Sequence, residues 1–572
     1  MSPGTPKVAR ILGVWDGHDC GAVLVEDGEL IVAVNEERFS RRKLETRFPF
    51  LAVQACLKHA GLQPKDIDTV AYCTVDVSKT IRRLFPRIQE NYYAVRRRKA
   101  PYRGSRAIER SLKYWVQEKS GNRLTSWLSR QCIHSELAKL GFSNPALVEV
   151  DHHAAHAASA AHMSGFDAAT VLTIDGLGDG LSATVNRYQD GKLERLESIP
   201  AADSLGVFFE HVTDLLNLRM LEDEGKVMAL ATHAYPVPDK ENPLLEFFRV
   251  DGMRISSRYH RVRQYEKLKG VLWRVASEQF AYMAQRTLEL HVTEWVRNAI
   301  RQTGLPCVAM AGGVAANIKV NMIIRELPEV QELFIFPHMG DGGLAAGSAL
   351  HAAALAGQCC LPLRDVYLGP EIDVPPAPPL GIEMDDLANV AEMATRAAEL
   401  IGNGEIILWF DGRMEFGPRA LGHRSILARP DLPEIRERLN LQMKRRVWYQ
   451  PFCPSILEAD AAELLEKATG RPNRYMTVGY RAKLDSRQKL QAVLGADGSC
   501  RPQLVADDDT PYSLLIKAVK NQIGLGCVLN TSMNIHGDPL VASIDQAWHL
   551  MIAHGFGHLF CPGLKRIYRR SG

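Results

Sequence analysis

The chain has 572 residues, which is long enough for more than one domain. Hydrophobic residues make up 46% and charged residues 24% of the sequence, which is typical of a globular protein. The net charge of +3 is too small to indicate a nucleic-acid partner.

The eleven cysteines contain no CxxC pair and no regular spacing, which indicates a reducing compartment with mostly buried thiols. The first residues have no apolar signal core, and no apolar run is long enough to span a bilayer. We therefore expect a cytoplasmic protein with no membrane partner.

The N-terminal residues have the pattern of a β-hairpin that is extended by a further strand. Residues 11–14, 21–25 and 30–34 are apolar strands, and the breaks between them contain Asp16-Gly17 and Asp27-Gly28. The same pattern returns at residues 171–174 and 182–188, with Asp-Gly loops at residues 175–180 and 189–192. We interpret this as an internal duplication, with chance similarity between two hairpins as the alternative. Two lobes that each open with an Asp-Gly loop predict a nucleotide site, because glycine lets backbone N–H groups approach phosphate.

After a helical pattern at residues 50–62, residues from about 80 to 140 are basic and aromatic and look like an insertion. The run at residues 92–99 contains Arg96, Arg97 and Arg98. It could bind an anionic or sugar-like substrate, but such a charge run more often marks a solvated helix face.

His152 and His156 are one helical turn apart. Asp151 is a good N-cap and the alanines that follow are strong helix formers, so both imidazoles should share one helix face. Such a pair suits a divalent metal, although two histidines on a helix surface are the plainer alternative.

A third glycine loop follows a strand at Gly312-Gly313, and a strand at residues 333–336 leads to Asp341 among glycines. A small-residue helix at residues 344–356 follows. A carboxylate at a strand end is often functional in α/β folds, and the alternative is that Asp341 caps the next helix.

Proline clusters mark residues 366–384 as a linker. We therefore predict a first domain at residues 1–365 and a second at residues 385–572. The second begins with a helix at about residues 386–402 and a strand at residues 406–410, followed by a loop rich in Arg and Gly. Arginine, Asn and Ser donors in this domain suit a small phosphate-like or carbamate-like anion.

The chain resembles the O-carbamoyltransferases that modify nodulation factors and antibiotics. The resemblance spans nearly the whole chain. It rests on His18-Asp19 and on residues 36–43, 152–159, 224–230, 311–314, 417–425 and 529–532.

This resemblance implies an α/β fold in two parts. The first part is similar to the tRNA threonylcarbamoyl transferase, with the duplicated architecture of actin, sugar kinases and heat-shock ATPases. The second, smaller part is similar to the threonylcarbamoyl-adenylate synthase. By analogy, the second domain converts carbamoyl phosphate and ATP to carbamoyl adenylate, and the first transfers the carbamoyl group to a hydroxyl of a small molecule such as a secondary metabolite or saccharide.

The resemblance also implies roles for individual residues. His152, His156 and Asp341 would hold a divalent metal, expected to be Fe(II), with Asp175 as a further ligand. His18 would be the general base for the acceptor hydroxyl, and its alternative role is a hydrogen bond within its own turn.

Nucleotide contacts are implied for Lys43, Asp175, Gly312, Gly313 and Asn317. Lys226 would line the same site, unless it is paired with an acid such as Glu222 or Glu224 and is only structural.

Carbamoyl phosphate contacts are implied for Arg419, Arg501, Asn530 and Ser532, with Arg424 nearby. The chain departs from the family at Gln450, where Arg is usual, and Arg445 or Arg446 would have to replace that charge.

Two other functions remain open from the sequence. One is a tRNA-modifying threonylcarbamoyl transferase, which the near-neutral charge disfavours. The other is a non-catalytic nucleotide-binding scaffold, which needs neither the histidine pair nor the arginines of the second domain. The sequence does not define the acceptor or the oligomeric state.

Overall fold

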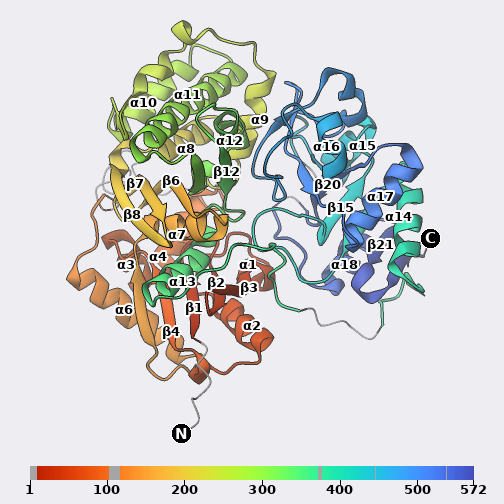
Figure 1. Ribbon diagram of the computed structural model, residues 1–572, viewed down its shortest axis with the longest axis horizontal. Coiled ribbons are helices and arrows are strands. Elements are labelled where there is room, and N and C mark those ends of the chain that lie inside the picture. The colour runs from red at the N-terminus through yellow and green to blue at the C-terminus, as the bar shows by residue number, and fades with distance from the viewer. Residues whose placement is uncertain are drawn as a thin grey trace. The chain divides into compact units, whose positions relative to one another are not determined.

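The computed structural model describes residues 9–101, 116, 118–371, 377–444, 446–535 and 537–571. The chain forms two compact units (Figure 1). The first contains Met1–Ser40 and Leu44–Arg364, and the second contains Arg41–Lys43 and Asp365–Gly572.

The first unit contains two five-stranded sheets with the same strand order. The first sheet has the order β3-β2-β1-β4-β5, from β1 (Arg10–Trp15), β2 (Gly21–Glu26), β3 (Glu29–Asn35), β4 (Thr69–Cys73) and β5 (Ala146–Val150). The second has the order β8-β7-β6-β11-β12, from β6 (Ala168–Gly178), β7 (Leu181–Gln189), β8 (Lys192–Pro200), β11 (Cys307–Ala311) and β12 (Glu332–Ile335).

In both sheets the first three strands pair antiparallel, the fourth strand pairs in parallel with the first, and the fifth pairs in parallel with the fourth. This identity of order and direction confirms the predicted duplication. It is the architecture shared by actin, sugar kinases and heat-shock ATPases.

Two helices lie between the sheets, α7 (His152–Ser164) and α13 (Leu344–Leu355), and they pack against each other (Figure 1). Helix α7 follows the first sheet in sequence but packs on β6 and β11 of the second, whereas α13 follows the second sheet and packs on β1, β2 and β4 of the first. This exchange of helices between the sheets explains why every residue of α7 except Ala154 is buried. It also puts the start of α7, where the histidines lie, next to the loops of both sheets.

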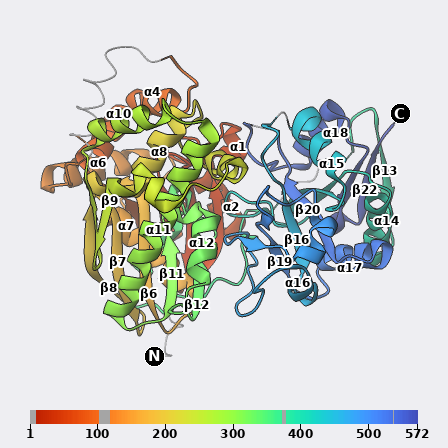
Figure 2. The ribbon, with the colours of Figure 1, turned by 90° about the horizontal axis from the view of Figure 1, so that it is seen from above.

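Other helices cover the sheets. Helix α2 (Phe50–Ala60) packs on β2 and β3, while α8 (Leu205–Leu215) and the long α11 (Ser277–Thr303) pack on β6 (Figure 2). The insertion between β4 and β5 forms α3 (Val77–Leu84), α4 (Pro86–Arg96) and α6 (Arg123–Ala138), and residues 102–115 and 117 of it lie outside the described residues. The remaining elements of this unit are α1 (Glu37–Ser40), α9 (Glu224–Leu230), β9 (Phe248–Asp251), β10 (Arg254–Ser257), α10 (Arg261–Leu272) and α12 (Ile318–Arg325).

The second unit is built on one eight-stranded mixed sheet with the order β13-β22-β21-β14-β15-β20-β16-β19. Its strands are β13 (Ile382–Asp386), β14 (Ile407–Phe410), β15 (Arg424–Ala428), β16 (Cys453–Leu457), β19 (Gln503–Val505), β20 (Cys527–Ser532), β21 (His558–Cys561) and β22 (Arg566–Arg570). Helices α14 (Val390–Gly402) and α17 (Pro511–Ile523) close its core over Trp409, Leu427 and Val528. The unit also contains α15 (Pro433–Glu437), α16 (Glu458–Leu464), α18 (Ile544–His554), β17 (Tyr480–Arg481) and β18 (Ser499–Cys500).

The start of this unit differs from the sequence-based prediction. The predicted helix from about residue 386 begins at Val390, because the Asn389 side chain accepts the N–H of Glu392 as an N-cap. The preceding residues, including the end of the predicted linker, form β13, which pairs antiparallel with β22.

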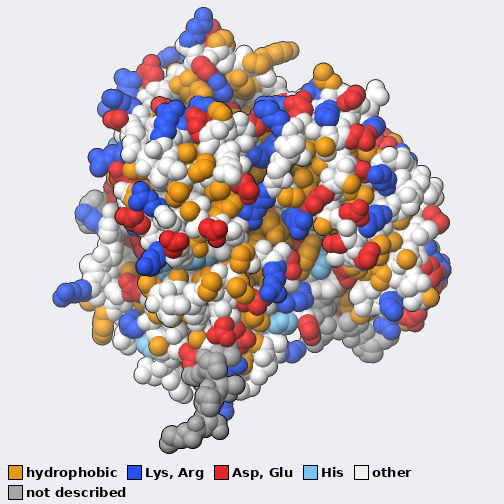
Figure 3. Space-filling model, in the orientation of Figure 1, with side chains coloured by type: hydrophobic (Ala, Val, Ile, Leu, Met, Phe, Trp, Pro, Cys, Tyr) orange, Lys and Arg blue, Asp and Glu red, His pale blue; other side chains and the backbone are white. Residues whose placement is uncertain are grey.

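No helix in the described part of the chain has both the length and the apolar character required to cross a bilayer. On the face of the molecule shown in Figure 3, Lys and Arg side chains are interspersed with Asp and Glu.

The crossing of α7 and α13 gives a first prediction. A Cβ on Gly347 would lie 2.0 Å from the backbone oxygen of Ala155, so the two helices can approach only because residue 347 is glycine. We expect Gly347→Ala to lower the free energy of unfolding by about 1–3 kcal/mol, measured by urea denaturation. Gly225→Ala in α9, where a Cβ meets nothing within 4 Å, is the control and should be neutral or stabilising. Equal effects of the two substitutions would contradict this packing argument.

Candidate active site

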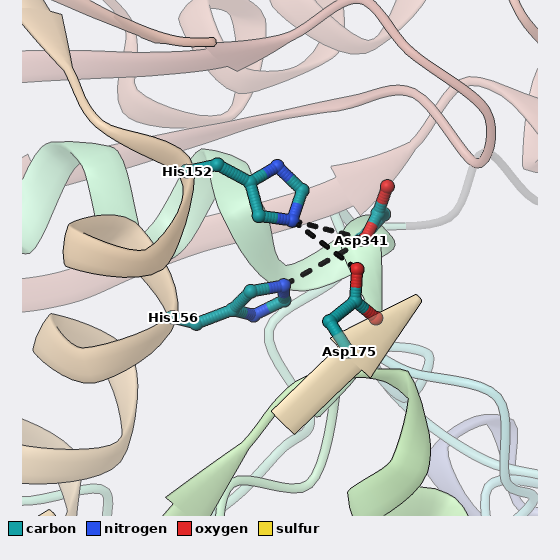
Figure 4. A group of neighbouring side chains, drawn as sticks. All are labelled: His152, His156, Asp175 and Asp341. Atoms are coloured by element: carbon teal, nitrogen blue, oxygen red, sulfur yellow. Dashed lines mark ion pairs between the residues drawn. The ribbon is translucent and has the colours of Figure 1, made fainter. Parts of the chain in front are cut away.

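The two histidines predicted as metal ligands lie in the first two turns of α7. The Asp151 side chain accepts the N–H of Ala154 and so starts the helix where the sequence predicts. The His152 and His156 rings are 4.8 Å apart between centroids, and both are about 98% buried because α7 is enclosed between the sheets. Both Nε2 atoms point toward two carboxylates (Figure 4).

These carboxylates come from distant segments. Asp175 lies in β6, and Asp341 follows the loop after β12. Nε2 of His152 is 3.4 Å from Oδ2 of Asp175 and 3.7 Å from Oδ1 of Asp341, and Nε2 of His156 is 3.6 Å from the same Oδ1. One ligand atom from each of the four residues lies within 4.8 Å of the others.

The four side chains fit a divalent metal. The Nε2 atoms of His152 and His156 are buried and make no hydrogen bond, which is costly unless their lone pairs have another partner. Nitrogen and oxygen ligands at about 2.0–2.2 Å from a first-row metal are roughly 3–3.5 Å from one another, close to the separations found here. Two imidazoles with carboxylates suit Fe(II) and neighbouring divalent metals.

The same charges shift the pKa values of the group. Burial acts to raise the pKa of Asp175, but nearby His152 and His156 and the Gly313 N–H lower it overall. Burial acts to lower the pKa of His152, but Asp341 and Asp175 raise it overall. The site therefore attracts positive charge, which is the property that a cation site requires.

His153, between the two ligand candidates, faces another way. Its Nδ1 is 2.7 Å from the Thr173 hydroxyl, and burial together with the neighbouring His152 and His156 lowers its pKa to about 3. It is therefore a neutral structural histidine.

His18, the predicted base, lies beside the cluster in the loop after β1. Its Nδ1 is 3.4 Å from Oδ2 of Asp341 and 3.3 Å from the hydroxyl of Tyr93 in α4. Burial lowers the pKa of His18, although Asp341 acts to raise it. Asp341 thus faces the metal-ligand candidates with one oxygen and His18 with the other.

The glycine loop after β11 also reaches this site. Gly312 has φ of +105°, and a Cβ there would lie 2.2 Å from the Ile174 oxygen. The N–H of Gly313 donates to Oδ1 of Asp175 at 2.6 Å. Asn317 caps α12 and exchanges two hydrogen bonds with Gln285, so its side chain is already occupied.

Two lysines with predicted nucleotide roles lie elsewhere. Nζ of Lys226 is 2.8 Å from Asp223, which favours the structural role considered for this residue, with a different acid from those expected. Lys43 belongs, with Arg41 and Arg42, to the second unit, and its contact with nucleotide stays a prediction.

Each arginine of the run in the insertion is paired with an acid, and Arg98 is also exposed to solvent. Arg96 pairs with Glu210, Arg97 with Glu222 and Arg98 with Asp214. These acids lie more than a hundred residues away in sequence. The sequence alone therefore could not predict that they neutralise the arginines.

In the second unit, four cationic side chains gather without a carboxylate partner among the described residues: Arg419, Lys444, Arg446 and Arg501. Burial and the charge of Arg501 lower the pKa of Arg419 to about 9. Burial and Arg501 likewise lower the pKa of Arg446 to about 10, although Cys453 acts to raise it. Such mutual repulsion is relieved when an anion binds.

Lys444, which the sequence-based prediction missed, is 99% buried, and its side chain contacts the last residues of β20. Its Nζ donates to the Thr531 hydroxyl at 3.1 Å and to the Ser532 hydroxyl at 3.2 Å. The signal for it in the sequence is the basic run Lys444-Arg445-Arg446.

Asn530 and Ser532 lie on β20 next to this group. Asn530 is directly opposite Cys453 on β16, and Cys453 Sγ accepts two N–H groups of Arg501 at 3.0 and 3.3 Å. The Asn530 Oδ1 is buried and has no hydrogen-bond partner, so it can accept an N–H from a ligand.

Arg424 has a different environment. Its guanidinium is fully buried, donates to the backbone oxygens of Asp411, Gly412 and His423, and lies 3.8 Å from the Phe410 ring. Arg424 therefore stabilises its own loop through these bonds, and its contact with carbamoyl phosphate stays a prediction.

Gln450, where the family usually has Arg, is close in sequence to Arg446 of the cation group. The Gln450 backbone oxygen accepts from the Asn440 side chain at 3.0 Å. Of the two arginines considered as replacements, Arg446 belongs to the cation group, and Arg445 lies outside the described residues.

Comparison with known proteins assigns the family. Residues 10–350 match the model of the carbamoyltransferase N-terminus, and residues 398–564 match that of the carbamoyltransferase C-terminus. The chain belongs to the carbamoyltransferase family. The enzyme is 32% identical to the nodulation protein NolNO of Sinorhizobium fredii, over 93% of this chain and 76% of that protein. It is 35% identical to an uncharacterised protein of Methanocaldococcus jannaschii, over 74% of each chain.

Among solved structures, HypF of T. kodakarensis matches 62% of the enzyme and 49% of its own chain, with 16% identity and a TM-score of 0.34.

The contrast between Arg424 and Arg419 gives a second prediction. Arg424→Met leaves several buried carbonyl oxygens unpaired and should lower the free energy of unfolding by at least about 2 kcal/mol. Arg419→Met removes a cation that Arg501 repels, so it should leave stability unchanged but weaken phosphate binding, measured by calorimetry. The assignment of the two roles is wrong if Arg424→Met loses phosphate binding without loss of stability.

Proposed function

We propose that this carbamoyltransferase uses carbamoyl phosphate and ATP to carbamoylate a hydroxyl group of a small molecule. Carbamoyl phosphate first loses phosphate to water, and an oxygen of the resulting carbamate displaces pyrophosphate from ATP. The acceptor oxygen then displaces AMP from the carbonyl carbon, and the hydroxyl proton passes to a base. The small net charge and the paired Arg96–Arg98 run favour a small-molecule acceptor over a nucleic acid.

The cation group of the second unit supports the donor half of this reaction. Arg419, Arg446 and Arg501 suit phosphate oxygens because guanidinium groups bind them through paired N–H donors. Asn530 Oδ1, opposite Cys453, suits the amide N–H of a carbamoyl group. An anion with an amide at one end matches both kinds of partner.

The observation that carries the proposal is the position of Asp341. Its Oδ1 lies 3.6 Å from His156 and 3.7 Å from His152, while its Oδ2 lies 3.4 Å from His18. A group that would hold a metal is therefore next to a group that would accept a proton. Transfer of an acyl-type group to a hydroxyl needs both at one place.

His18 is well arranged to act as the base. With Nδ1 turned toward the Asp341 carboxylate and the Tyr93 hydroxyl, the tautomer protonated on Nδ1 is favoured, which would leave Nε2 to accept the hydroxyl proton. Because burial lowers its pKa, the imidazole is neutral and ready to accept a proton near pH 7.

His152, His156, Asp341 and Asp175 would hold the metal, Fe(II) or another divalent ion, in the first unit. When bound, it would supply Lewis-acid stabilisation of negative charge on the phosphate of the leaving AMP. The Gly313 N–H fixes Asp175 through its other oxygen, so that carboxylate is oriented before a metal binds.

The donor half can be tested without knowing the acceptor. With ATP and carbamoyl phosphate, the enzyme should release pyrophosphate and form carbamoyl adenylate, detected by mass spectrometry. Arg501→Met should abolish this, whereas Arg566→Met, an exposed arginine paired with Asp386 in the same unit, should not. Pyrophosphate release that does not depend on carbamoyl phosphate would contradict the proposed donor.

The transfer half predicts a specific effect of His18. Once an acceptor is found by screening hydroxylated compounds, His18→Gln should lower kcat for transfer by roughly 10²–10⁴-fold, the usual contribution of a general base. Metal content, measured by mass spectrometry of the purified protein, should stay unchanged because His18 is not a ligand in this account. A variant that keeps full kcat would show that another group takes the proton.

A further inference from the structure

Thr74, immediately after β4, has an unusual backbone conformation. Its φ is +67°, in the left-handed region that β-branched residues strongly avoid, and the residue is 96% buried. Such strain persists only where the surroundings enforce it, and it often marks a functional position.

The conformation places the Thr74 hydroxyl against a metal-ligand candidate. Oγ1 of Thr74 is 3.1 Å from Nδ1 of His152, the ring nitrogen opposite the one that faces the carboxylates. The Thr74 N–H donates to the Val150 oxygen at 3.1 Å, which ties the residue to the end of β5, two residues before His152. The hydroxyl and the start of α7 are therefore held together.

Arg83, in α3 of the insertion, holds the strained backbone. It donates to the Thr74 oxygen at 2.6 Å and to the Cys73 oxygen at 2.8 Å. The same guanidinium binds both oxygens of Asp16, at 2.8 and 3.0 Å. Asp16 lies two residues before His18 and also pairs with Lys79 at 2.8 Å. All these side chains are more than 90% buried.

We propose that Thr74, locked by Arg83, is a positioning residue that sets the tautomer and orientation of His152 for metal binding. The inference rests on the metal site of the proposed function. To bind a metal through Nε2, a neutral His152 must carry its proton on Nδ1, and that N–H then donates to Thr74 Oγ1. The Thr74 hydroxyl proton is left to donate to Cys73 Sγ, which is 3.3 Å away.

This network gives the insertion a role. It is anchored at three points around the candidate active site: Thr74 next to His152, Asp16 near His18, and Tyr93 on His18 itself. The segment that the sequence marks as an addition to the fold therefore supports both halves of the site, and its Arg83 does so through Thr74 and Asp16.

A matched pair of variants tests the proposal. Thr74→Val keeps the β-branched shape and loses the hydroxyl, while Thr74→Ser keeps the hydroxyl. We expect Thr74→Val to weaken Co(II) binding to the metal-free protein by roughly 10–100-fold, and Thr74→Ser to bind nearly as the unchanged protein does, in titrations followed by the Co(II) absorption spectrum. Circular dichroism and the Tm of the metal-free proteins confirm that both variants fold.

Thr213→Val is the control for loss of a buried threonine hydroxyl, since the Thr213 hydroxyl donates to the Phe209 oxygen within α8. It should leave Co(II) affinity unchanged. A folded Thr74→Val that binds Co(II) as tightly as the unchanged protein would overturn the role of Thr74 alone. If His152→Ala binds Co(II) as tightly as the unchanged protein, the metal site itself is wrong, and this inference falls with it.

Discussion

Asp341 presents one carboxylate oxygen to His152 and His156 and the other to His18, and this shared carboxylate connects the candidate metal and proton-transfer groups. The arrangement depends on the exchange of helices between the two sheets. Helix α7 carries the histidines from the end of the first sheet onto the second, where β6 supplies Asp175. Asp341 itself begins the segment that leads into α13, which returns to the first sheet and the His18 loop. Four ligand candidates from three distant segments therefore meet because the duplicated halves interlock.

Much of this fold could be predicted from the sequence, because its signals are local. The Asp-Gly turns fix the hairpins of both sheets, and Asp151 followed by alanines fixes the start of α7. The spacing of His152 and His156 already shows that they share a face. Asp175 and Asp341 could be joined to them only through resemblance to a family, since no local rule brings residues so far apart in sequence together.

Other features depend on tertiary contacts that leave no local signal. Nothing near Thr74 predicts a left-handed threonine, because its conformation is enforced by Arg83 and Val150. The charges of Arg96–Arg98 suggested a solvated face or an anion site, but their partners are acids on α8 and in the segment before α9. Arg424 is a residue type that suits an anionic ligand, but its guanidinium donates to backbone oxygens of its own loop. Residue type suggests what a side chain can do, and its neighbours decide whether it is free to do it.

The cation group of the second unit also depends on its neighbours, but here the neighbours leave the charges unpaired. Burial, together with neighbouring cations, lowers the pKa values of Arg419, Arg446 and Lys444 and costs free energy, and no described carboxylate pairs with them to offset it. A bound anion would offset that cost, so these buried charges lower the stability of the ligand-free protein and favour anion binding. In the first unit the effect is the opposite, because the carboxylates of Asp341 and Asp175 raise the pKa of His152 and so favour a positive charge there. In the proposed function, the second unit would bind the phosphate of the donor and the first would bind the metal beside the base.

A crystal structure of the enzyme loaded with Fe(II) under anaerobic conditions, with data collected at the iron absorption edge, tests this account most directly. The account predicts an anomalous peak bound by His152, His156 and Asp341, with Asp175 at the same site and His18 still facing the other oxygen of Asp341. Iron bound elsewhere, or bound there with His18 turned away from Asp341, would contradict it.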